Sequence, residues 1–157
     1  MQIHDILAKY EASPDQLLNI LHDTQNHSAQ SYISESDIAA IAKYINTTKA
    51  AVYGLVEYYS MFSSQPRGKY VIRVCKSPIC RMLGGQDILN SIQSALNIPI
   101  GGTDEEKLFT LEVSECLGHC DKAPVMMVND ELHTNLTPEK IDSILNKYRQ
   151  KKSKNHD

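Results

Sequence analysis

Residues 69–80 read KYVIRVCKSPIC, and residues 108–120 read LFTLEVSECLGHC. In both stretches a run rich in apolar, β-branched and aromatic residues leads into cysteines, and such runs are typical of β-strands. Four residues separate the first two cysteines of the chain, and three residues separate the last two. We therefore predict two strands, each followed directly by a loop that carries a pair of thiols.

The segments around these two stretches complete a recognisable order of elements. Apolar residues recur at helical spacing over 88–96, which predicts a helix between the two strands. Residues 125–128 (VMMV) read as a buried strand, with a short partner strand around Leu132. Thr137 and Pro138 open a final helix, with Thr as N-cap and Pro in the first turn. The order β-α-β-β-α is compatible with a thioredoxin-like sandwich of a mixed sheet and helices.

The part of the chain that precedes these elements reads as a helical bundle. Ser34, followed three residues later by Asp37, resembles a capping box, and the isoleucines that come next mark one helix face. Thr47 or Thr48 can cap a further helix. The polar stretch 22–31 (His22 to Ser31) is either the fraying end of an earlier helix or a loop.

A turn signal at Pro66-Arg67-Gly68 separates the two patterns. We predict an α/β (α+β) chain with an N-terminal helical region over 1–66 and a thioredoxin-like domain over 67–150. The residues that remain, 151–157, are charged and poor in apolar side chains, and we expect them to fray.

Composition excludes several classes of protein. A chain of 157 residues with a net charge of -3 lacks the excess of basic side chains typical of nucleic-acid binders. No segment approaches the roughly 18 consecutive apolar residues of a membrane span, and the first residues lack a signal or transit peptide. We expect a cytoplasmic protein without direct membrane insertion. Reducing conditions there make disulfides improbable, so the four cysteines point to metal or redox chemistry.

Thiolates are the preferred ligands of zinc and of iron–sulfur clusters, and both are considered for Cys75, Cys80, Cys116 and Cys120. Zinc sites usually contain a tighter knuckle than spacings of four and three. These looser spacings fit a binuclear cluster in which each pair serves one iron, although spacing alone leaves zinc open. A thiol–disulfide oxidoreductase normally uses Cys-x-x-Cys, which is absent. A third alternative, four unrelated buried cysteines, is the weakest because the cysteines cluster in two pairs.

Other residues in and after the two loops have structural interpretations. Pro78 stiffens the first loop, and Gly118 permits a sharp turn with positive φ in the second. Gly84 and Gly85 read as a turn, although they would also let backbone approach a ligand. His119 could replace a cysteine, as histidine does in Rieske centres, but four cysteines already complete the set. We expect the His119 side chain to lie beside the site or to be exposed.

Three stretches carry a resemblance to a known family. They are residues 115–148 (ECLGHCDKAPVMMVNDELHTNLTPEKIDSILNKY), 52–80 (VYGLVEYYSMFSSQPRGKYVIRVCKSPIC) and 32–45 (YISESDIAAIAKYI). The sequence resembles the thioredoxin-like [2Fe-2S] family of the complex I 24-kDa-type subunit. That family also serves NAD-dependent [FeFe] hydrogenases, including electron-bifurcating ones, and NAD-dependent formate dehydrogenases.

The resemblance implies that the four motif cysteines bind one [2Fe-2S] cluster and that the chain transfers electrons without catalysing a reaction itself. It also implies a larger flavoprotein partner that carries FMN, the NADH site and a [4Fe-4S] cluster, with further iron–sulfur or hydrogenase subunits beyond it. No G-x-G-x-x-G follows a strand, which agrees with FMN and NAD(H) lying only on that partner. The parent complex would be a soluble hydrogenase or related enzyme, or else complex I. The alternatives are a zinc-stabilised interaction module and a stand-alone ferredoxin-type carrier.

The aromatic end of the helical region has two interpretations, as a lid on the sheet or as a docking surface for the flavoprotein. Candidate anchors for docking are Tyr53, Tyr58, Tyr59 and Phe62, although aromatic residues at helical spacing are more often core. Glu57 lies where the family usually has a small or uncharged residue, so it is expected to alter packing or a subunit contact.

Overall fold

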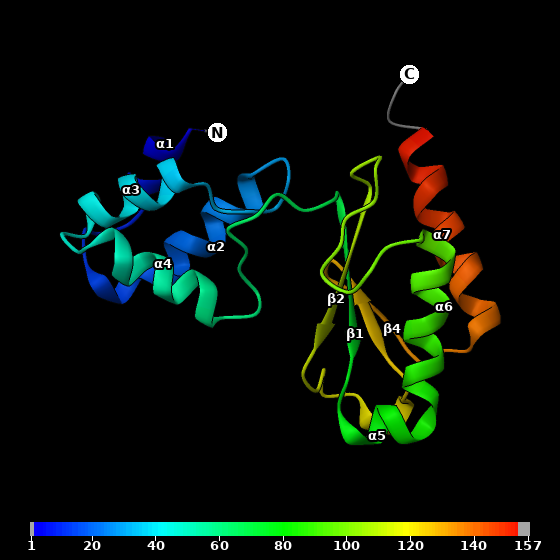
Figure 1. Ribbon diagram of the computed structural model, residues 1–157. Helices are drawn as coiled ribbons and strands as arrows, with labels where there is room; N and C mark the ends of the chain where they lie inside the picture. The colour runs from blue at the N-terminus through cyan, green and yellow to red at the C-terminus, as the bar shows by residue number, and fades with distance from the viewer. Residues whose placement is uncertain (1, 154–157) are drawn as a thin grey trace. The chain divides into compact units, whose positions relative to one another are not determined.

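The computed structural model describes residues 2–153 and comprises two compact units, Met1–Arg67 and Gly68–Asp157 (Figure 1). The first unit is helical, and the second contains a sheet with helices. Residues 154–157 of the predicted frayed tail lie outside the described residues. In the described part of the chain, no helix is both long and apolar enough to cross a bilayer.

Capping side chains fix where two helices of the first unit begin. Ser34 Oγ accepts a hydrogen bond from the Asp37 backbone N–H, and the Ser34 N–H donates to the Asp37 carboxylate, which completes the predicted capping box. Thr48 rather than Thr47 caps the next helix, because its Oγ1 accepts from the Ala51 N–H. The elements of this unit are α1 (Ile3–Leu7), a 3-10 turn (Pro14–Gln16), α2 (Leu17–His27), α3 (Glu35–Tyr44) and α4 (Lys49–Tyr58).

More than half of the polar stretch 22–31 is helical, because α2 continues to His27 and Ser28 is its C-cap. Apolar side chains on one face of each helix meet in a core that buries Ile20, Leu21 and Ile41 completely. Burial of such faces, rather than helix propensity, supplies most of the stability of helices this short.

The second unit contains the predicted strands and both predicted helices; when the short partner strand around Leu132 is counted, the order becomes β-α-β-β-β-α, with α5 and two short helical turns in addition. Its elements are β1 (Tyr70–Cys75), α5 (Pro78–Cys80), a π-helical turn (Arg81–Gly85), α6 (Gln86–Leu96), β2 (Phe109–Ser114), a 3-10 turn (Cys120–Lys122), β3 (Met126–Val128), β4 (Glu131–His133) and α7 (Pro138–Ser153). The strands form one sheet in the order β2-β1-β3-β4. β1 pairs parallel with β2, and the other pairs are antiparallel, so the sheet is mixed as predicted.

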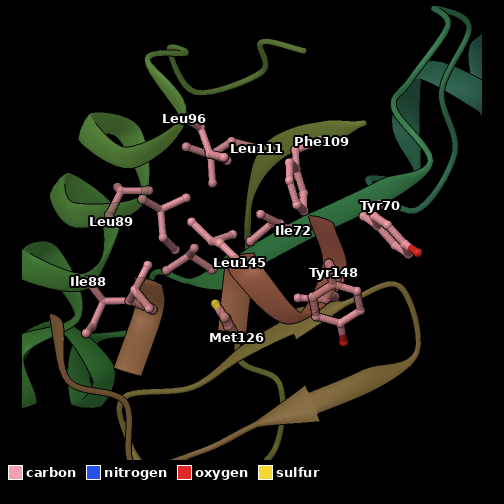
Figure 2. Packing of buried hydrophobic residues seen from close by; sticks show 14 of the residues in the cluster. Tyr70, Ile72, Ile88, Leu89, Leu96, Phe109, Leu111, Met126, Leu145 and Tyr148 are labelled. Carbon is pink, nitrogen blue, oxygen red and sulfur yellow. The ribbon is translucent and has the colours of Figure 1, made fainter. Parts of the chain in front are cut away.

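Helices α6 and α7 pack on one face of this sheet (Figure 1). Ile72 of β1 and Leu111 of β2 point into the same apolar layer as Leu145 of α7 (Figure 2). These side chains are almost fully buried, and each contributes about 1.5–3 kcal/mol by leaving water. This core holds the strands in register.

The register brings both cysteine loops to one end of the sheet. Cys75, the last residue of β1, lies opposite Ser114, the last residue of the parallel strand β2. The Lys76 N–H donates to the Ser114 carbonyl at 2.9 Å, which holds the start of the first loop against the start of the second. The Cys75 N–H donates to the Val125 carbonyl at 3.2 Å and ties β3 to the same end.

Candidate metal centre

The first pair of cysteines is buried. Cys75 closes β1 and Cys80 closes the single helical turn α5, which Pro78 opens. Their exposed fractions are 3% and 0%. A Cβ at Gly85 would lie 2.7 Å from the Cys80 carbonyl oxygen, so the π-helical turn passes too close to Cys80 for any larger residue. Leu83 and Gly84 have non-helical backbone angles, with a φ of +96° at Gly84, so the Gly84-Gly85 pair lies at a sharp kink between α5 and α6, in agreement with the predicted turn.

The second pair lies in the loop between β2 and the 3-10 turn. Cys116 is exposed and Cys120 is half-buried, and their Sγ atoms are 3.4 Å apart. Two thiolates on one tetrahedral metal, with bonds of about 2.3 Å, would be about 3.8 Å apart. Gly118 adopts a positive φ of +80°, which glycine permits, and its N–H donates to Cys116 Sγ at 3.4 Å. This loop is shaped to present two sulfurs side by side.

Backbone and apolar contacts join the two pairs. The Leu117 backbone N–H approaches the Cys75 thiol from the second loop, and the Val125 backbone approaches Cys80. Val125 also packs with both buried cysteines, and Leu117 and Leu132 pack partly against the same cluster. All four cysteines therefore gather at one end of the sheet.

The surroundings of each thiol change its acidity in a different direction. Burial alone would raise the pKa of Cys75, but hydrogen bonds from the Ser77 hydroxyl and from backbone N–H groups lower it on balance. Cys75 Sγ lies 3.4 Å from Ser77 Oγ. Burial raises the pKa of Cys80. The neighbouring Cys116 thiol raises the pKa of Cys120, and burial adds to this increase.

The donor set fits a group that takes thiolates in two pairs, since each loop supplies two sulfurs and backbone N–H groups point at them. Among residues 2–153, no three His, Cys, Asp or Glu side chains close around one point as ligands of a single ion. His119 is half-buried, and within the described residues only its backbone carbonyl has a hydrogen bond, from the Lys122 N–H.

Several residues of this end of the molecule were not singled out from the sequence. Ser77 beside Cys75 had no distinguishing pattern, because a serine in a loop is ordinary. The exposed apolar side chains of Ile79, Met82 and Leu83 surround Cys80 in sequence, with exposed fractions of 47%, 84% and 56%. The sequence alone does not show that these apolar side chains are exposed, so no local pattern identified them.

Comparison with known proteins identifies the class. Residues 3–149 match the profile of the family described as thioredoxin-like [2Fe-2S] ferredoxin. The chain therefore belongs to the thioredoxin-like [2Fe-2S] ferredoxin family, as the resemblance predicted.

Relatives from two bacteria agree with this family. The chain is 38% identical over 118 residues to a subunit of the NADH-quinone oxidoreductase of Salmonella typhimurium, which covers 75% of this chain and 71% of the relative. It is 31% identical over 148 residues to the corresponding subunit from Buchnera aphidicola subsp. Baizongia pistaciae, which covers 94% and 85%.

A crystal structure of an NAD+-reducing [NiFe]-hydrogenase in the air-oxidized state superimposes on 90% of this chain with a TM-score of 0.75 and 19% identity. This chain spans only 24% of that hydrogenase chain. The hydrogenase likeness therefore shows a shared fold.

Proposed function

We propose that this chain is the [2Fe-2S] electron-transfer subunit of a multi-subunit NAD(H)-dependent oxidoreductase, with one cluster held by Cys75, Cys80, Cys116 and Cys120. The observation that carries the proposal is the meeting of two thiol pairs at the ends of neighbouring parallel strands. Membership of a [2Fe-2S] family supports the choice of this cluster over zinc.

When bound, such a cluster supplies a centre that takes up and returns one electron at a time. The residues of this chain hold and shield that centre rather than act on a substrate. Backbone N–H groups of Ser77, Leu117 and Gly118 directed at sulfur favour negative charge, whereas burial of Cys75 and Cys80 opposes it. The balance between these two effects tunes the reduction potential.

The partner in this proposal is a larger flavoprotein that carries FMN, the NADH site and a [4Fe-4S] cluster, with further iron–sulfur or hydrogenase subunits beyond it. The names of the curated relatives support membership of such a complex. The exposed side chains of Ile79, Met82 and Leu83 adjoin Cys80 and offer an apolar surface beside the cluster site. Contiguous exposed apolar residues mark sites of protein association.

Two tyrosines of the helical unit remain candidate anchors for the same partner. Tyr58 and Tyr53 are exposed, and Tyr53 lines a surface groove of about 430 Å³ within that unit. Phe62 is buried and Tyr59 half-buried against the helical core, so these two belong to its packing. The carboxylate of Glu57 accepts a hydrogen bond from Ser64 Oγ at 2.6 Å, so this side chain makes a contact within the helical unit.

The names of the curated relatives, subunits of NADH-quinone oxidoreductase, support complex I as the parent. In that parent this chain would be a peripheral subunit, and we propose that it lies in the cytoplasm. The fold shared with the NAD+-reducing hydrogenase is compatible with a soluble hydrogenase, including an electron-bifurcating one. The flavoprotein that accompanies the chain in its native host decides between these parents.

The proposal is tested by anaerobic purification of the full chain, followed by iron, zinc and acid-labile sulfide analysis. EPR spectra are recorded before and after reduction with dithionite. We expect about two irons and two sulfides per chain, and a paramagnetic signal only in the reduced state. Zinc without sulfide, under handling that preserves clusters, would leave a zinc-stabilised interaction module. A normal cluster without an accompanying flavoprotein would favour a stand-alone carrier.

Variants test the ligand assignment. Cys116→Ala and Cys120→Ala should each lose the cluster, while His119→Ala, which changes the residue next to Cys120, should keep it. Full iron content and an unchanged spectrum in either cysteine variant would show that the assignment is wrong.

A further inference from the structure

The two cysteine pairs differ sharply in access to solvent. Cys75 and Cys80 are enclosed with Val125 in an apolar cluster. Cys116 is exposed, and its Sγ lies 3.4 Å from that of Cys120. Small oxidants in solution can therefore reach the second pair of a cluster-free chain without opening the fold, whereas the first pair is shielded.

We propose that Cys116 and Cys120 form an oxidation site in the cluster-free chain, where a peroxide converts them to a disulfide that prevents cluster assembly until a thiol reductant reopens it. The disulfide itself follows from the geometry of the loop. Its consequence for assembly rests on the proposed function, because it requires both cysteines to be cluster ligands.

The loop needs little rearrangement to close. A disulfide has an S–S length of about 2.05 Å, so the two sulfurs must approach by little more than 1 Å. Gly118 lies midway between them with φ of +80°, and nothing lies within 4 Å of the position where its Cβ would be. Side-chain rotation together with a small shift of this open loop is enough to bring the sulfurs together.

The chemistry balances with a peroxide as oxidant. The Cys116 thiolate attacks one oxygen of hydrogen peroxide, the O–O bond breaks, and a sulfenic acid and water result. Cys120 Sγ then attacks that sulfur, the S–O bond breaks, and a second water leaves with the remaining thiol proton. Two thiols and one peroxide give one disulfide and two waters. A dithiol reductant reverses the modification by thiol–disulfide exchange.

The test uses the full chain after removal of iron and sulfide with a chelator under reducing conditions. The reductant is removed, hydrogen peroxide is added, and the remaining thiols are alkylated before peptide mass spectrometry. We expect the free thiols to fall from four to two, with alkylation at Cys75 and Cys80 and a bridge between Cys116 and Cys120. Iron and sulfide should then fail to restore the absorption spectrum unless dithiothreitol is added first.

Two variants distinguish oxidation of the second cysteine pair from oxidation of the first. Cys80→Ser should form the Cys116–Cys120 bridge as the parent does, and Cys116→Ser should form none. Alkylation of all four thiols after peroxide, or a bridge that includes Cys75 or Cys80, would overturn the proposal. Reconstitution of the oxidised chain without reductant would overturn the block on assembly. A reduced chain that takes up no cluster would instead count against the proposed function, while the peptide analysis would still decide the bridge.

Discussion

At the scale of single residues, Glu131 on β4 shows how tertiary contacts change side-chain chemistry. Its carboxylate accepts hydrogen bonds from Lys147 Nζ at 2.9 Å and from Tyr148 Oη at 2.8 Å, both on α7. These contacts lower the pKa of Glu131 from 4.5 to about 2, with Lys147 the larger cause. Burial, together with the Glu131 carboxylate, raises the pKa of Tyr148.

This network predicts a pH dependence of stability. Because the folded-state pKa of Glu131 lies below its ordinary value, ionised Glu131 stabilises the fold above pH 4.5, and the contribution is lost as the pH falls towards 2. The side chain is 44% exposed, so solvent screening limits the contribution to about 1 kcal/mol. Glu131→Gln should therefore be less stable than the parent at pH 7, and the difference should shrink below pH 4.5.

The measurement is urea unfolding of variant and parent in the same buffers, so that any acid lability of the cluster affects both alike. Glu105→Gln is the control, since its exposed side chain makes no hydrogen bond or ion pair with any residue in 2–153. A constant difference across the pH range for Glu131→Gln would contradict the assignment.

The adjacent glycines Gly84 and Gly85 differ in their surroundings, which allows a second prediction for single residues. A Cβ at Gly85 would come within 2.7 Å and 2.9 Å of the backbone oxygen and carbon of Cys80, which cannot move without displacing its thiol. Gly85→Ala should therefore lose most of its iron, as measured by iron per chain.

Gly84→Ala is the matched control. Its Cβ would meet nothing within 4 Å, but its φ of +96° costs an alanine about 1–2 kcal/mol. This variant should melt at a lower temperature and keep its iron. Equal iron loss in both variants would mean that backbone strain, and not proximity to Cys80, is responsible.

At the scale of elements, sequence reasoning succeeded where the signal is local. The capping box at Ser34 and the run of β-branched and aromatic residues that leads to Cys75 depend on neighbours within a few residues, and both elements form as predicted. The short helix α1 (Ile3–Leu7) was not identified individually, because one turn of helix has too little periodicity and is held by the helices it contacts.

In the candidate site, too, sequence reasoning identified the local features and missed the long-range contacts. The thiols were visible in the sequence because cysteine spacing is a local pattern. The contacts of Cys75 with the Leu117 backbone and of Glu131 with Tyr148 were not, since they join residues 42 and 17 positions apart. Such contacts follow from strand register and helix packing, which a single sequence does not specify residue by residue.

Adjacent threonines before α4 (Lys49–Tyr58) give a prediction for an element. Sequence reasoning left Thr47 and Thr48 as equal candidates, whereas in the structure only Thr48 accepts from the Ala51 N–H, at 3.2 Å. Thr48→Ala should lower the free energy of unfolding of the helical unit by about 1 kcal/mol. Thr47→Ala should change it by only a few tenths of a kcal/mol, as followed by circular dichroism during urea unfolding. The reverse order would show that the helix begins one residue earlier.

At the scale of the whole molecule, the arrangement leaves the apolar side chains of Met82 and Leu83 exposed beside the buried Cys80. Exposed Met and Leu side chains add little to stability, and neighbouring exposed apolar residues mark sites of association with another protein. In the proposed function the partner approaches this end of the sheet, so this patch is the first place to interrupt docking without changing a proposed ligand.

The double variant Met82→Asp/Leu83→Asp should bind the flavoprotein at least about 10-fold more weakly, because buried apolar anchors at interfaces are worth about 1–2 kcal/mol each. Its iron content and EPR spectrum should equal those of the parent, since neither residue is a proposed ligand. The rate at which NADH bleaches the iron–sulfur absorption, measured by stopped flow with the purified flavoprotein, should fall in step with binding.

The swap Met82→Leu/Leu83→Met controls for this change, since it preserves apolar area and should bind as the parent does. Parent-like binding by the aspartate variant, together with weak binding by Tyr53→Asp/Tyr58→Asp, would move the docking surface to the helical unit. In that case the position of the π-helical turn at the surface would follow from its backbone alone. The close approach of Gly85 to Cys80 fixes that backbone, whatever side chains residues 82 and 83 carry.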